Sequence, residues 1–222
     1  MSATENMTIL KLRFFSGKKL WAESTAKTND RGLTLISEDF NYAMYAKRGF
    51  EIDRRVPIDR LRGPKLIRGV ADPNIVISAA TADNIDSVVE YDGKVTSLQR
   101  SDYVTKWLLS DVTTSLVATR NGVVVGYGVV CLNKDNLYRL GPLFADSVAI
   151  AQTLTLNMLE TLPGNPLFTM DADPNDSKID YLIANRAEIT SVLKTSFNFP
   201  NSDIALDRQK IFCYSEMALC TT

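Results

Sequence analysis

The fold is decided by residues 115–162, which read SLVATRNGVVVGYGVVCLNKDNLYRLGPLFADSVAIAQTLTLNMLETL. Asn121-Gly122 divides two apolar runs and is the strongest short signal for a β-hairpin, because both turn residues tolerate positive φ. A second turn follows, so three successive strands are predicted, at 115–119, 123–132 and 137–144. The pattern then predicts a helix at 147–162, with Asp146 as its N-cap.

Comparable patterns continue on both sides of this stretch. Upstream, the sequence predicts a strand at 75–79 and helices at 83–91 and 100–109. Downstream, it predicts a strand at 167–171, a helix at 175–185 and a closing strand at 211–219. The order β-α-α-β-β-β-α-β-α-β is typical of a mixed sheet with helices on its faces. The predicted fold class is therefore α/β, in the form of an α+β mixed sheet.

The first 70 residues are patterned differently. Short strands are predicted at 7–15 and 33–36, and helices at 18–28 and 38–47. Proline, glycine and charged residues concentrate in 51–74, which is the best candidate for a linker. The expected division is a partial segment plus linker at 1–70 and a folded domain at 71–222.

The composition restricts the chemistry that the chain can perform. Histidine is absent, which excludes Ser/His and Cys/His nucleophilic systems, imidazole acid–base catalysis and most zinc sites. Catalysis would have to use carboxylates, tyrosine, thiols, backbone amides or the positioning of substrates.

Charge and cysteine content indicate the expected partners and the cellular compartment. The net charge is −1, and the basic residues between positions 54 and 68 read as a solvated linker, so no nucleic-acid partner is expected. The three cysteines lack metal-type spacing and are interpreted as thiols in a reducing compartment. The sequence shows no apolar leader and no run long enough to span a bilayer, so a cytoplasmic protein without a membrane partner is expected.

Particular residues within the predicted order resemble the GNAT superfamily of N-acetyltransferases. Gly126-Tyr127-Gly128, followed by LGPLFAD at 140–146, is similar to the GNAT-like module often found in the C-terminal half of two-domain acetyltransferases. Tyr91-Asp92, followed by Arg100, is similar to another stretch of that module. The resemblance covers about two thirds of the chain and implies a GNAT-like acyl-CoA N-acyltransferase fold.

The N-terminal segment resembles the second half of a GNAT domain. GKKLW at 17–21 is similar to the end of a pyrophosphate loop and the helix that it opens, and MYAKRGF at 44–50 is similar to the late helix. Phe15 and Leu12 stand where that loop usually has a glycine and an Arg or Gln. Too few residues precede the loop to form the missing first half, so this segment is predicted to be a fragment of a GNAT domain.

The resemblance implies acetyl-CoA as co-substrate. A splayed strand must offer free backbone groups to the pantetheine arm, and the following helix must present its first amides to the pyrophosphate. The residues that would provide these groups are Leu140, Gly141, Leu143, Phe144, Ala145, Ser147, Val148 and Ala149. Asp146 places a carboxylate beside the expected phosphates. The alternatives are a bulged edge strand without a ligand and a simple helix cap.

Further residues are candidates for catalysis and acceptor binding. Tyr181 is the candidate proton donor to the thiolate, and a half-buried structural tyrosine is the alternative. Asp92 and Arg100 fall near the connection between the two predicted helices, which borders the acceptor site in this fold. There they would bind an acceptor or pair with each other at the surface. Asp171 and Asp173 are the remaining carboxylates that could serve as a base, although acidic turns are common.

The leading hypothesis is acyl-CoA-dependent transfer of an acetyl group to a small-molecule or peptide amine. The alternative is a catalytically inactive GNAT-like protein that serves for binding or scaffolding, because a fold does not fix a function. The sequence is compatible with an oligomer but does not define an oligomeric state.

Overall fold

The protein is described from a computed structural model. The structure describes residues 22, 34–38, 42–48, 51–52, 58–64, 72–132, 137–164, 167–173, 176–183, 188–198 and 206–214. The predicted strand at 7–15 and, apart from residue 22, the predicted helix at 18–28 lie outside these residues.

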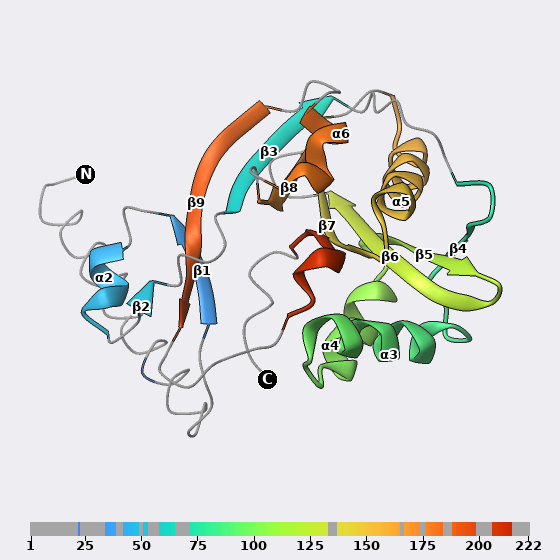
Figure 1. The fold of residues 1–222 in the computed structure, drawn as a ribbon, viewed down its shortest axis with the longest axis horizontal. Helices are drawn as coiled ribbons and strands as arrows, with labels where there is room; N and C mark the ends of the chain where they lie inside the picture. The colour runs from blue at the N-terminus through green and yellow to red at the C-terminus, as the bar shows by residue number, and fades with distance from the viewer. Residues whose placement is uncertain are drawn as a thin grey trace, which may run out of the picture.

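One mixed sheet organises the described residues (Figure 1). Its strands are β1 (Thr34–Glu38), β2 (Glu51–Ile52), β3 (Ile58–Pro64), β4 (Val76–Ala79), β5 (Thr113–Arg120), β6 (Val123–Leu132), β7 (Tyr138–Ala145), β8 (Leu167–Ala172), β9 (Glu188–Asn198) and β10 (Ile211–Cys213). The order across the sheet is β1-β9-β3-β8-β7-β6-β5-β4, with β10 paired to β7 and β2 paired to β9. β7 and β8 pair in parallel, and the other described pairs are antiparallel.

The β5–β6 hairpin confirms the turn predicted at Asn121-Gly122. Asn121 and Gly122 adopt φ values of 52° and 78°, the left-handed conformation that such a turn requires. β6 then pairs with β7 from Gly126↔Ala145 to Leu132↔Tyr138. The predicted mixed α/β fold is therefore observed.

Helices cover both faces of this part of the sheet (Figure 1). The helices are α2 (Tyr42–Ala46), α3 (Ile85–Thr96), α4 (Ser101–Leu108), α5 (Val148–Glu160) and α6 (Asp180–Ile183), with 3-10 turns η2 (Ser177–Ile179) and η3 (Arg208–Lys210). α5 and α6 contribute to one hydrophobic core, which includes Leu140, Leu143 and Phe168. α3 and α4 contribute to the other core, which includes Val117, Tyr127 and Phe144. Alternating side chains of the central strands thus fill both sides of the sheet.

The segment predicted as a linker contains a strand of the sheet. β3 lies between β8 and β9, with Leu61 opposite Met170 on one side and Ile189 on the other. The linker reading of 51–74 is wrong for this strand. The sequence did not indicate β3 because its few apolar residues are separated by charged residues, proline and glycine. The strands with which β3 pairs also lie more than 100 residues away in the sequence. The domain division at 70/71 stays a prediction.

The region after β8 also differs from the sequence prediction. The helix expected at 175–185 is the turn η2 followed by the short helix α6. β9 was not predicted, and the closing strand expected at 211–219 is described only as β10, with a bridge from Tyr214 to Asp171. Over the described residues, no helix has the length and apolar character needed to cross a membrane.

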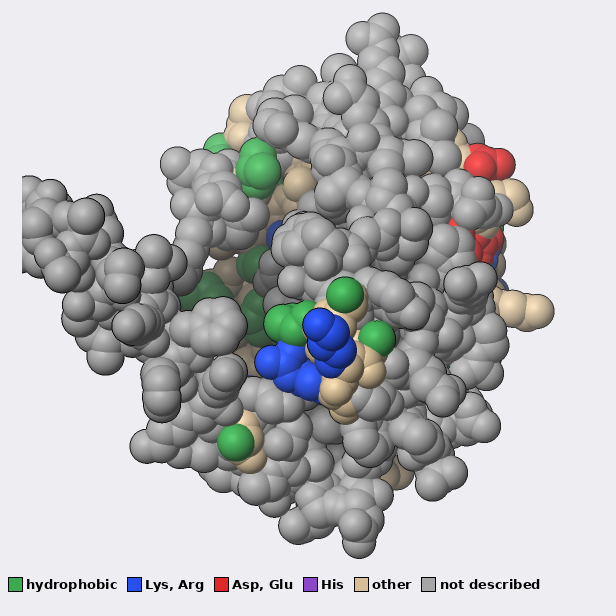
Figure 2. Space-filling view, turned by 90° about the vertical axis from the view of Figure 1, so that its left-hand side faces the viewer, with side chains coloured by type: hydrophobic (Ala, Val, Ile, Leu, Met, Phe, Trp, Pro, Cys, Tyr) green, Lys and Arg blue, Asp and Glu red, His purple; other side chains and the backbone are tan. Residues whose placement is uncertain are grey.

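Figure 2 shows the face on the left-hand side of Figure 1. Among the described side chains on this face, a cluster of Lys and Arg lies near the middle beside hydrophobic side chains, and acidic side chains lie at the right-hand edge. The described charge on this face is therefore divided between separate patches.

Candidate coenzyme site

β7 and β8 define the candidate site because they separate along their length. Their parallel pairing is confined to Tyr138↔Phe168 and Arg139↔Thr169, near the start of both strands. Beyond Arg139 the two strands no longer pair with each other. In open α/β sheets, ligands bind in a crevice outside the carboxyl ends of parallel strands. This is the position at which the sequence predicted a coenzyme.

The residues predicted to bind coenzyme divide into a buried and an exposed group. Those on β7 are buried: Leu140, Gly141, Leu143, Phe144 and Ala145. Ser147 and Val148 are exposed and Ala149 is half-buried, where the chain turns into α5. A ligand could therefore contact the backbone of β7, and both the backbone and the exposed side chains at the first turn of α5.

Ser147, and not Asp146, is the N-cap of α5. The Ser147 side chain accepts a hydrogen bond from the Ile150 amide at 3.4 Å, and its backbone is extended, as is typical of this position. The backbone of Asp146 still belongs to the sheet edge, since its amide donates to the Val125 carbonyl at 2.9 Å. The prediction of an Asp146 cap was off by one residue, because β7 runs one residue further than predicted. The first amides of a helix have no acceptor within it, and the residues at this point, Ser147 and Val148, are exposed.

Asp146 instead forms a cluster with a tyrosine and a lysine. Its Oδ1 accepts a hydrogen bond from the Tyr91 hydroxyl at 3.0 Å and lies 3.1 Å from Lys210 Nζ. Burial and the nearby Asp146 carboxylate raise the pKa of Tyr91, so its phenol stays protonated. Lys210 thus places a cation beside Asp146, two residues before α5 begins. Sequence reasoning missed this residue, because nothing local connects positions 146 and 210.

Asp92 and Arg100 form a buried ion pair. Arg100 Nε donates to Asp92 Oδ1 at 2.7 Å, and Nη2 donates to Oδ2 at 2.6 Å. The Tyr127 hydroxyl donates to the same carboxylate, which connects β6 to α3 and to the start of α4. The predicted pairing is confirmed, but the pair is in the core and not at the surface, with side chains 1% and 6% exposed. A role in acceptor binding stays a prediction.

Tyr181 lies on α6 and points toward α5. Its hydroxyl is 3.3 Å from Thr155 Oγ1, and the residue is buried. Burial raises the pKa of Tyr181 well above that of a free tyrosine, and an ionised Cys213 would raise it further. Tyr181 is thus close enough to Cys213, on β10, for the two groups to interact. The hydroxyl keeps its proton at neutral pH, as a proton donor must.

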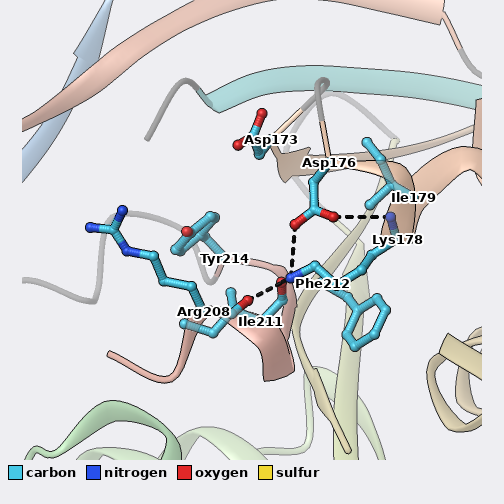
Figure 3. A pocket seen from close by; sticks show the side chains of 8 residues that line it. All are labelled: Asp173, Asp176, Lys178, Ile179, Arg208, Ile211, Phe212 and Tyr214. Carbon is cyan, nitrogen blue, oxygen red and sulfur yellow. Dashed lines mark hydrogen bonds and ion pairs between the residues drawn. The ribbon is translucent and has the colours of Figure 1, made fainter. Parts of the chain in front are cut away.

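The two candidate bases have different environments. Asp171 is buried and forms an ion pair with Arg139 across the β7–β8 interface. Asp173 is half-buried and lines a cavity of about 100 Å³ at the end of β8 (Figure 3). The opposite wall of this cavity includes Arg208, Phe212 and Tyr214, from η3 and the β10 strand.

β10 occupies part of the gap between β7 and β8. Ile211 lies opposite Phe144 and Cys213 lies opposite Leu143, so this edge of β7 is paired. On the other side, the Tyr214 amide donates to the Asp171 carbonyl on β8 at 2.9 Å. The exposed residues Ser147 and Val148, with Lys210 bound to the neighbouring Asp146, would suit the pyrophosphate of an acyl-CoA. The β7 residues fit its pantetheine arm only after β10 has left the edge of β7.

Comparison with known proteins identifies the family. Residues 88–213, more than half of the chain, match the family model of the Acetyltransferase (GNAT) domain. The chain therefore belongs to the GNAT family of acetyltransferases.

Within the described residues, no group of three or more cysteine, aspartate or glutamate side chains is placed to hold a metal ion.

Three further proteins are similar to this chain, one in sequence and two in fold. The holothin acyltransferase of Pseudoalteromonas sp. is 31% identical over 96 residues, covering 43% of this chain and 32% of that protein. A Pyrococcus horikoshii protein proposed to be an acetyltransferase superposes with a TM-score of 0.63 at 16% identity, covering 86% of this chain and 60% of that one. A tandem GNAT protein from the clavulanic acid biosynthesis pathway has a TM-score of 0.55 at 15% identity, covering 82% and 69%. These two structures establish the fold alone, and the chain spans about a third of the acyltransferase's length.

Proposed function

We propose that the chain is an acyl-CoA-dependent N-acyltransferase that transfers an acetyl group to a small-molecule or peptide amine. The observation that carries this proposal is the start of α5 directly after β7, where Ser147 and Val148 are exposed and Lys210 binds the preceding Asp146. Membership of the GNAT family and similarity to an acyltransferase support transfer of an acyl group in general.

The first turn of α5 would hold the pyrophosphate. The amides of Ser147, Val148 and Ala149 would donate to it, because the first amides of a helix lack an acceptor and the helix dipole adds partial positive charge there. Lys210 would supply the cation that the sequence of the turn lacks, while its contact with Asp146 offsets the charge of that carboxylate. The backbone from Leu140 to Ala145 would hold the pantetheine arm on the edge of β7 that β10 covers at Leu143 and Phe144.

The remaining groups would act around the reacting atoms. Bound acetyl-CoA supplies an activated acyl group as a thioester. Tyr181 carries a proton on its hydroxyl and is the proposed donor to the departing sulfur. The Asp92–Arg100 pair would shape the α3–α4 connection against which an acceptor amine is held, so that proximity supplies much of the rate.

Calorimetric titration of the full chain with acetyl-CoA tests this proposal. Binding at a hundredfold excess over Kd would stabilise the fold by about 2.7 kcal/mol, which a thermal shift also detects. Ala149→Glu is expected to abolish binding through bulk and like charge, and Asp146→Asn is expected to tighten it. Ala82→Glu, which adds the same charge at an exposed turn, is the control. Absence of heat at high micromolar acetyl-CoA, with folded protein, would contradict the proposal.

A second candidate function is a catalytically inactive GNAT-like module for binding or scaffolding. The observation that favours it is the pairing of β10 with the edge of β7 that the pantetheine arm would use. This candidate predicts no thermal shift with CoA, acetyl-CoA or longer acyl-CoAs, and no effect of Ala149→Glu.

A further inference from the structure

Residues 206–214, here termed the C-terminal strap, cross the gap between β7 and β8. The strap contains η3 and β10, and four successive residues of it are buried: Ile211, Phe212, Cys213 and Tyr214. Ile211 and Tyr214 join the core beneath α3 and α4, while Phe212 and Cys213 join the core beneath α5. The strap therefore lies within the plane of the sheet.

The strap meets β7 through its backbone, as a pantetheine arm would. Gly141 of β7, at φ 141°, faces it closely: a Cβ at this position would lie 2.5 Å from the Tyr214 carbonyl oxygen and 2.9 Å from Cys213 Sγ. The thiol of Cys213 lies 3.0 Å from the Leu140 carbonyl, to which it donates. The resemblance placed Gly141 among the coenzyme-binding residues, whereas the structure shows the chain's own strap beside it.

Lys178, on the turn η2 that follows β8, binds the strap. Its Nζ donates to the carbonyls of Arg208 and Ile211, at 2.5 and 3.2 Å, and lies 2.8 Å from an Asp176 carboxylate oxygen (Figure 3). The ammonium group also lies 5.3 Å from the centre of the Phe212 ring. Lys178 thus connects η2 to both ends of η3. Hydrogen bonds from a charged donor are stronger than neutral ones.

A cavity lies between the strap and the residues that follow β8, among them Asp173, Asp176 and Lys178. The cavity beside the strap has a volume of about 100 Å³. Sites for drug-sized ligands commonly have volumes of roughly 300–1,000 Å³. This cavity is therefore smaller than a typical ligand site, and the strap provides Arg208, Phe212 and Tyr214 of its lining.

We propose that the C-terminal strap and the pantetheine arm of an acyl-CoA compete for the same edge of β7. The strap is then an intramolecular competitor, held closed by Lys178, and acyl-CoA binds only to the form in which the strap has left this edge. This inference rests on the proposed function, since it concerns the same site. Any ligand that binds only the open form has its apparent affinity reduced by the fraction of chains that are open.

Cys213 reports on the position of the strap without requiring catalysis. Its thiol is fully buried while the strap is closed and becomes accessible when β10 leaves β7. Alkylation by iodoacetamide, resolved by mass spectrometry, distinguishes Cys213 from Cys131 and Cys220. Acetyl-CoA is a suitable probe because its sulfur is acylated and does not consume the reagent.

The experiment measures Cys213 alkylation and acetyl-CoA affinity in the full chain. Saturating acetyl-CoA is expected to accelerate alkylation of Cys213 by about tenfold or more, as for any ligand that selects the open form. Lys178→Met keeps the apolar stem on Phe212 but removes the charged donor, so it is expected to raise the unliganded alkylation rate and the affinity by about tenfold each. Lys178→Arg should retain most of the closed form. Lys94→Met, at an exposed lysine paired only locally with Glu90 in its described contacts, is the matched control.

The outcomes separate the two proposals. Binding of acetyl-CoA with unchanged or slower alkylation of Cys213 would overturn the competition but leave the proposed function standing. No binding to either the wild type or Lys178→Met would overturn both. Because the wild-type measurement with and without acetyl-CoA needs no substitution, the test does not depend on the folding of a variant.

Discussion

Arg100 holds Asp92 through two parallel hydrogen bonds of 2.7 and 2.6 Å inside the core. The planar guanidinium matches both carboxylate oxygens, and the Tyr127 hydroxyl donates to one of them. This group joins two helices to the central strand β6, so it fixes the position of α3 and α4 on the sheet.

Replacing Asp92 by Asn is expected to lower the free energy of unfolding by about 3–5 kcal/mol, because Arg100 is left as an uncompensated buried charge. The exposed pair Glu90–Lys94 offers a control, and Glu90→Gln should change stability by less than about 0.5 kcal/mol. Denaturant midpoints measure both. Equal effects of the two substitutions would show that the buried pair adds nothing beyond a surface pair.

Gly141→Ala is expected to destabilise the protein by about 2–5 kcal/mol, because backbone strain adds to overpacking against the strap. The new Cβ would meet the Tyr214 carbonyl at 2.5 Å. Gly164→Ala is the matched control: φ there is 63°, but the Cβ meets open space, so only the backbone cost of about 1 kcal/mol is expected. Thermal unfolding measures the difference, and equal losses would contradict the close contact of strap and strand.

Stability is expected to fall at alkaline pH because of Cys213. Burial, with a smaller effect of Asp171, raises the pKa of this thiol from 9.0 to about 12. A group whose pKa is raised by folding stabilises the protein fully below its unfolded pKa, and this stability is lost as pH rises toward the folded value.

Between pH 9 and 10, the free energy of unfolding of the wild type should therefore fall more steeply than that of Cys213→Ala, by up to about 1.4 kcal/mol per pH unit. Tyr214, whose pKa burial raises from 10.0 to about 12, adds a similar loss in both proteins at higher pH. Denaturation curves at stepped pH measure the two slopes. Parallel profiles from pH 9 to 10 would contradict the burial of this thiol.

Lys210→Met is expected to weaken acetyl-CoA binding by about tenfold, equivalent to about 1.4 kcal/mol, if Lys210 contacts the pyrophosphate. The loss should shrink at high salt, since the contact is partly exposed. Lys94→Met serves as the control in the same titration. Unchanged affinity would restrict Lys210 to its contact with Asp146.

The central fold could be predicted because its signals are local. The Asn121-Gly122 turn, the three strands around it and the amphipathic helices lie within short windows, and the structure contains each of them. β3 could not be predicted in the same way. Its residues IDRLRGP carry two widely spaced apolar side chains, and only pairing with β8 and β9 makes them a strand.

The candidate site was predicted in its sequence position but not in its surroundings. The exposed start of α5 follows from the helix boundary, which sequence reasoning placed one residue early. The neighbours Lys210 and Tyr91 come from distant parts of the chain and meet Asp146 only in the folded protein. The burial of the Asp92–Arg100 pair likewise depends on β6, which no pattern around residues 92–100 reveals.

An amide-resolved NMR titration of the labelled full chain with acetyl-CoA tests the central claim most directly. If the first turn of α5 holds the pyrophosphate, acetyl-CoA should shift the amide signals of Ser147, Val148 and Ala149 with one saturable Kd. In the Ala149→Glu variant, addition of acetyl-CoA should leave the amide signals of Ser147 and Val148 unchanged. No shift at these amides at millimolar acetyl-CoA, or shifts confined to residues remote from α5, would contradict the proposed coenzyme site.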